Sequence, residues 1–121
     1  MAKRVPPAAG LAALAEWRAG TTDRTALATA VRFTLSQLEA NAPGRSVEVR
    51  VPPYGAVQIL EGTSHRRGTP PAVIEMDAQT WLELATGALA WADAVARARV
   101  VASGERANLA SLLPLTDTPA P

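Results

Sequence analysis

The chain has 121 residues, which is enough for one ordinary domain with a core of its own and too few for two. Hydrophobic residues make up 48% of it, but much of that share is alanine, so a few large side chains must form the core. The net charge is only +1, and all but one of the 12 basic residues are arginine, so neither a nucleic-acid surface nor an anionic membrane is indicated as a partner.

The sequence also argues against several kinds of chemistry. It contains no cysteine, which excludes disulfides, thiol nucleophiles and cysteine-ligated zinc. A single histidine offers no catalytic triad and no histidine-based metal site, and no glycine-rich phosphate loop is present. We therefore expect no enzyme, no metal and no cofactor.

No apolar run reaches the roughly 18 residues that cross a bilayer, so no integral membrane association is expected. The N-terminus only faintly resembles a secretory signal, because its apolar stretch is alanine-rich, broken by two prolines and followed by Glu16. We expect a cytoplasmic protein.

In chain order, residues 8–19 predict a short alanine-rich helix after Pro6 and Pro7, ending at Gly20, where glycine commonly closes a helix. We expect this N-terminal extension, residues 1–22, to be an appendage or a docking helix.

A longer amphipathic helix is predicted over about residues 23–40. A Thr/Asp cluster is suited to cap its start, and the sequence NAPG stops it. Its apolar face carries Leu27, Val31, Leu35 and Leu38 at spacings of four, four and three residues.

The next segments alternate with the period of strands. SVEVRV buries Val47, Val49 and Val51 on one face, and AVQILEG (56–62) alternates again after the turn PPYG, so the two predict an antiparallel hairpin. AVIEMD predicts a more deeply buried strand. Between them, TSHRRGTPP is a loop or a short edge strand.

The stretch TWLELATGALAWADAVA predicts two short helices and not one. Asp77 caps the first, which carries Trp81 on its apolar face, and Gly87 ends it because glycine takes the left-handed conformation without steric cost. The second carries Trp91 and Val95 one turn apart.

The chain closes with a predicted strand at RVVASGE, a short helix at RANLASLLPL ended by Pro114, and a flexible tail over residues 116–121. The strands are grouped early and helices are added on one side. This order predicts an α+β fold with one sheet and one layer of helices.

From AVIEMD onward the chain resembles the sterol carrier protein family, the type-two non-specific lipid-transfer domain. The resemblance rests on the strand that ends in Asp77, on Trp81 and Leu84, on TGAL and an alanine-rich helix, and on a strand closed by Gly104. The segments VPP, AVQ and RGTPP, with His65 to Arg67, are similar to the bacterial sterol-carrier-orthologue branch. The resemblance covers about residues 23–115.

The resemblance implies a single, mostly antiparallel sheet of four to five strands with helices on one face, and the predicted N-terminal helix lies outside it. TSHRRG is the candidate for a fifth strand. It also implies an apolar tunnel that holds a sterol, a fatty acyl chain or another lipid, with no catalytic residues. Two positions depart from the family pattern: Ala98 stands where glycine is usual, and Ala90 where a polar helix cap is common.

Large apolar side chains are the candidates for an apolar pocket. The stronger interpretation is that they form the core, since the chain has only five aromatic residues to fill the space between helices and sheet. The candidates are Phe33, Ile59, Trp81, Leu84, Leu89, Trp91, Val95, Leu109, Leu112 and Leu113.

The loop SHRRGTPP offers the one polar cluster of interest. Histidine titrates near neutrality and arginines bind carboxylates and phosphates, so His65, Arg66 and Arg67 are candidates to contact a lipid head group or an acyl-CoA. The alternatives are a solvated loop, or an ion pair of Arg67 with Glu61 or Glu75.

The leading hypothesis is a small lipid-binding or carrier protein whose partner is an apolar small molecule such as a lipid, a fatty acyl compound, an acyl-CoA or a sterol-like molecule. The rival is a non-enzymatic interaction or scaffold module of the same fold with a closed cavity, which forms a homodimer or docks a protein through the N-terminal helix. A third hypothesis is an accessory to a biosynthetic enzyme that holds an anionic intermediate with Arg66 and Arg67.

Overall fold

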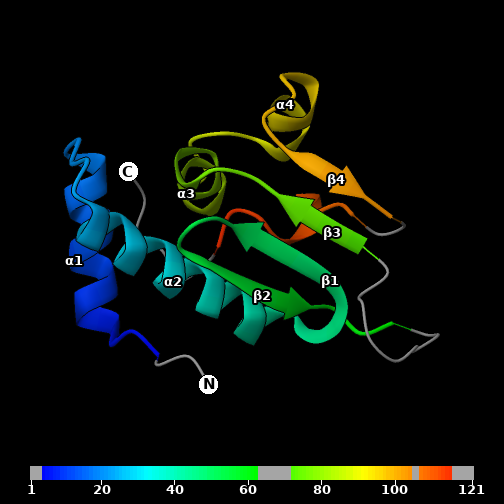
Figure 1. Ribbon diagram of the computed structural model, residues 1–121, viewed down its shortest axis with the longest axis horizontal. Helices are drawn as coiled ribbons and strands as arrows, with labels where there is room; N and C mark the ends of the chain where they lie inside the picture. Colours follow the sequence, from blue (N-terminus) through cyan, green and yellow to red (C-terminus); the bar gives the residue numbers. More distant parts are fainter. Residues whose placement is uncertain (1–3, 63–71, 105–106, 116–121) are drawn as a thin grey trace.

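The computed structural model describes residues 4–62, 72–104 and 107–115. The four described strands form one open sheet in the order β2-β1-β3-β4, and α2 runs along one face of it (Figure 1). This arrangement confirms the predicted α+β class. The elements in chain order are α1 (Pro7–Arg18), α2 (Arg24–Asn41), β1 (Pro43–Val51), β2 (Gly55–Ile59), β3 (Ala72–Glu75), α3 (Ala78–Thr86), α4 (Trp91–Ala96), β4 (Val101–Ser103) and the 3-10 turn η1 (Ala110–Leu112).

The sheet is mixed. β1 pairs antiparallel with β2, and β3 antiparallel with β4, whereas β1 and β3 run parallel at the centre. The predicted hairpin is confirmed, and its turn is closed by the amide of Tyr54, which donates to the Val51 carbonyl at 2.9 Å. β2 ends earlier than predicted, at Ile59, because Leu60 adopts a left-handed conformation (φ 62°) and its amide bonds the Ala42 carbonyl at 2.8 Å.

The alternation of β1 separates a dry face from a wet one, as the sequence predicts. Val47, Val49 and Val51 are fully buried under the helices. Glu48 and Arg50 point to the opposite face, where their side chains form an ion pair at 2.8 Å. The apolar core therefore lies on one side of β1.

A buried hydrogen bond joins α2 to α3. The indole Nε1 of Trp81 donates to Thr34 Oγ1 at 2.7 Å, and both side chains are completely buried. The Thr34 hydroxyl in turn lies 2.7 Å from the Ala30 carbonyl, to which it donates. The only polar atom of the Trp81 side chain is thereby satisfied inside the core, as buried polar groups require.

The two predicted short helices are confirmed. The Asp77 carboxylate accepts from the Thr80 amide at 2.8 Å and begins α3, and Gly87 ends it in the left-handed region (φ 87°). α4 then begins after Ala90, whose methyl side chain provides no cap.

The last predicted helix is too long. Within residues 107–115 only η1 is helical, because the Asn108 side chain accepts from the Ala110 amide at 2.8 Å and starts a single turn before Pro114. The segment is nevertheless anchored: Leu109 and Leu115 are buried, and the Leu115 amide donates to the Ala85 carbonyl of α3 at 3.0 Å.

α4 ends in a way that normally calls for glycine. Ala98 adopts a left-handed conformation (φ 57°), its amide bonds the Val95 carbonyl at 3.0 Å, and the Arg99 amide bonds the Ala94 carbonyl at 2.9 Å. This pair of bonds is the Schellman closure of a helix, in which a Cβ is unfavourable. The departure at Ala98 from the family pattern is thus accommodated at an energetic cost.

We predict that Ala98→Gly raises the free energy of unfolding by about 1 kcal/mol, because glycine takes this conformation without strain. Ala92→Gly, at an exposed position inside α4, is the matched control and is expected to lower it by up to about 1 kcal/mol. Urea denaturation of both variants measures the two values, and an equal loss in both would contradict strain at Ala98.

We predict that Thr34→Val lowers the free energy of unfolding by about 1–3 kcal/mol, since it leaves the buried Trp81 indole N–H without an acceptor. Thr34→Ser keeps the hydroxyl and should lose less. In a Trp81→Phe background the cost of Thr34→Val should shrink, because no donor remains. A cost that is unchanged in that background, measured by denaturation, would refute the coupling.

Candidate functional site

The structure places most of the predicted apolar pocket residues in the core. Trp81, Leu84 and Leu109 are fully buried between the sheet and the helices. Val95, in contrast, is half exposed on α4. The other predicted residues are buried (Phe33, Ile59, Leu89, Trp91) or partly buried against the core (Leu112, Leu113).

α1 is packed into the molecule and does not project from it. Leu14 is fully buried, and Gly10 lies directly against the aromatic ring of Phe33 on α2, where a Cβ would overlap the ring. At the other end of α1, Trp17 Nε1 donates to Gln79 Oε1 of α3 at 2.9 Å. α1 therefore contacts two of the helices that cover the core, α2 and α3.

Polar side chains extend this contact across α3. Gln79 Nε2 donates to Glu83 Oε2 at 2.9 Å, and Glu83 Oε1 forms an ion pair with Arg99 at 2.8 Å. Arg99 Nε also donates to Thr80 Oγ1 at 3.1 Å. The ion pair is partly exposed, so its contribution is orientation more than stability.

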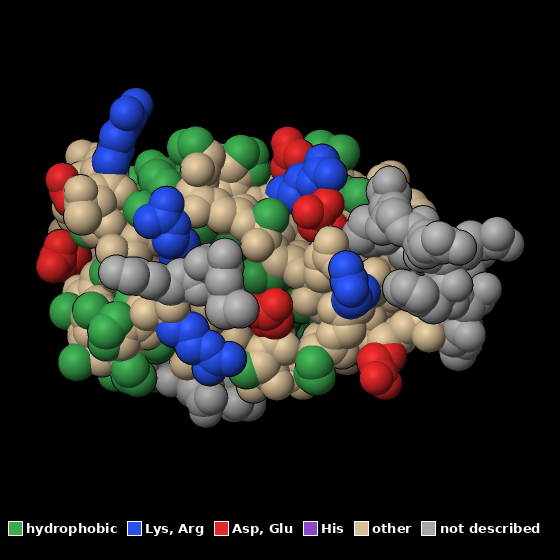
Figure 2. Space-filling model, turned by 60° about the horizontal axis from the view of Figure 1, so that its bottom comes forward, with side chains coloured by type: hydrophobic (Ala, Val, Ile, Leu, Met, Phe, Trp, Pro, Cys, Tyr) green, Lys and Arg blue, Asp and Glu red, His purple; other side chains and the backbone are tan. Residues whose placement is uncertain are grey.

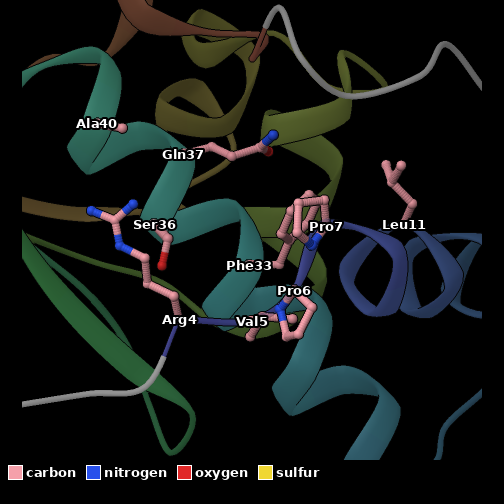
Figure 3. Close-up of a pocket in the computed structure, with 9 residues that line it drawn as sticks. All are labelled: Arg4, Val5, Pro6, Pro7, Leu11, Phe33, Ser36, Gln37 and Ala40. Carbon is pink, nitrogen blue, oxygen red and sulfur yellow. The ribbon is translucent and has the colours of Figure 1, made fainter.

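A hollow of about 520 Å³ lies between the start of α1 and the outer face of α2 (Figure 3). Its size falls in the range of about 300–1,000 Å³ that small-molecule sites occupy. Figure 3 shows the segment from Arg4 to Pro7 crossing beside α2, with the Phe33 ring at the centre. The residues that line the hollow are Arg4, Val5, Pro6, Pro7, Leu11, Phe33, Ser36, Gln37 and Ala40.

A second hollow of about 550 Å³ lies at the other end of α1, against α3. Its walls carry the hydrogen-bonded side chains of Trp17, Gln79 and Glu83, together with Thr86 and the turn after α1. Because those polar groups already bond one another, this hollow offers less to a ligand than the first.

Of the ten predicted apolar residues, Phe33 is the one that the structure places in the wall of the first hollow. Sequence reasoning did not single out Arg4 or Gln37. The available signal was helical spacing: Phe33, Ser36, Gln37 and Ala40 stand at i, i+3, i+4 and i+7 on one face of α2. The predicted head-group residues His65, Arg66 and Arg67, and the candidate fifth strand, lie outside the described residues.

Charges of both signs are interspersed on the face shown in Figure 2, and hydrophobic side chains gather at the end where α1 lies. Within residues 4–62, 72–104 and 107–115, no group of three histidine, aspartate or glutamate side chains is placed to hold a metal ion. No helix in that part of the chain is long and apolar enough to cross a membrane.

Comparison with protein families identifies the fold. A family model described as bacterial SCP ortholog, where SCP stands for sterol carrier protein, matches residues 23–115. The chain belongs to this family. Membership indicates a small lipid-binding or carrier type of domain, in a family that is generally non-enzymatic. No curated protein matches the chain. All four described strands lie inside the matched region and α1 lies before it.

We predict that Leu14→Ala lowers the free energy of unfolding by about 2–5 kcal/mol, because α1 contributes a fully buried side chain to the core although it precedes the matched region. Leu11→Ala, on the exposed side of the same helix, is the control and should cost much less. Thermal or urea denaturation distinguishes them; equal, small losses would mean that α1 is an appendage.

Proposed function

We propose that the protein binds and carries a small apolar molecule, such as a lipid, a fatty acyl compound or a sterol-like molecule, without converting it chemically, in the cytoplasm. The observation that supports this best is the family match, which spans the whole described sheet and the helices α2, α3 and α4 that pack with it.

The packing of the described core limits where such a ligand can be held. Trp81, Leu84 and Leu109 are fully buried, so the space between helices and sheet is occupied by the protein's own side chains. A ligand in that space requires the helices to separate. A ligand at the hollow beside α2 requires no such movement, and the hollow is lined mainly by apolar side chains.

We expect delipidated protein to bind a fluorescent fatty acid analogue saturably, with one molecule per chain at micromolar concentration. Native mass spectrometry of freshly purified protein should show a co-purified lipid. Protein unfolded in urea is the control and should show only unsaturable partitioning of the probe.

Failure to find either a co-purified lipid or saturable binding would overturn the proposal. It would favour the alternative, an interaction module of the same fold with a closed cavity.

A further inference from the structure

The hollow beside α2 joins a cation to an apolar wall. Arg4 is the one charged side chain among the described residues that line it, and Pro6, Pro7, Leu11 and Phe33 supply apolar surface. Within the described part of the chain no carboxylate forms an ion pair with Arg4. A positive charge next to an apolar groove suits a molecule with a negatively charged head and an apolar tail.

Gln37 is a second polar residue in the lining of the hollow. The side-chain oxygen of Gln37 is buried and accepts no hydrogen bond from any described residue. Because a carboxylate is itself an acceptor, this oxygen cannot pair with it, and among the described lining residues Arg4 supplies the charge for an anionic head group. Figure 3 shows Gln37 extending from α2 on the side of Pro7 and Leu11.

We propose that this hollow is a binding site for a medium-chain fatty carboxylate. The carboxylate binds the guanidinium of Arg4, and the alkyl chain lies along Pro7, Leu11 and the Phe33 ring. The inference rests on the proposed function and deepens it, because it names the site and the head group.

Arg4 is the single cation among the described residues that line the hollow, and this favours a carboxylate over a phosphate. One guanidinium matches the two oxygens and the single charge of a carboxylate, whereas a dianionic phosphate would retain an uncompensated charge in this site. Ser36, which also lines the hollow, offers a neutral hydroxyl and no further positive charge.

The site also depends on α1. Gly10 allows α1 to lie directly on Phe33, and this contact holds the segment from Arg4 to Pro7 beside α2. The hollow therefore combines residues before the matched region with residues of the family domain. A relative with another N-terminal segment would lack it.

The test is calorimetric titration of the full chain with decanoate, decanol and decyl phosphate. We expect decanoate to bind more tightly than the other two. Arg4→Gln should weaken decanoate about fivefold and leave decanol unchanged, since only the carboxylate uses the charge. Leu11→Gln, at a position 37% exposed, should weaken decanoate and decanol alike without unfolding the protein.

Arg24→Gln is the matched control, because it removes the same charge from an exposed position of α2 outside the hollow, and decanoate affinity should not change. If decanoate binds and neither Arg4→Gln nor Leu11→Gln weakens it, the site is wrong while the carrier function stands. Tighter binding of decyl phosphate overturns the carboxylate assignment. Failure of the chain to bind any alkyl compound or the fluorescent fatty acid analogue overturns both.

Discussion

The hydrogen bond between Trp81 and Thr34 is the constraint on which the helical layer depends. An indole is the largest side chain the chain can use to fill the space above the sheet, and it brings a donor that must be satisfied. Thr34 supplies the acceptor from a helix 47 residues away in the sequence. The bond fixes where α3 lies on α2, and α1 then contacts both helices through Phe33 and Gln79.

The sheet adds to the stability because one of its faces is apolar and buried and the other is polar. The valines of β1 face the helices, while Glu48 and Arg50 face outward. The strand order places β1 and β3 in the middle, where Val49 lies opposite Ile74 and both are fully buried. At the edges of the sheet, β2 contributes the buried Ile59, whereas all three residues of β4 are exposed.

Much of this fold could be predicted because local chemistry determines it. Gly20 and Gly87 have positive φ at helix ends, and the alternation of β1 and the turn PPYG produce a hairpin. Ala98 shows the limit: it closes α4 without glycine, so no local signal marks that end. The hollow could not be predicted, because the packing of α1 on α2 places Arg4 and Gln37 in the same lining. The residue that permits this packing is Gly10, and from the sequence alone glycine indicates only a weak helix former.

The contact of Gly10 with Phe33 has a consequence for the unit of folding. Similarity to the family begins at residue 23, yet the ring that α1 covers belongs to the matched region. A fragment that begins at residue 23 would keep every described strand. It would also expose the Phe33 ring and the apolar surface around it to water, and such an exposed apolar patch favours self-association. The start of the family match and the start of the packed structure therefore fall at different places in this chain.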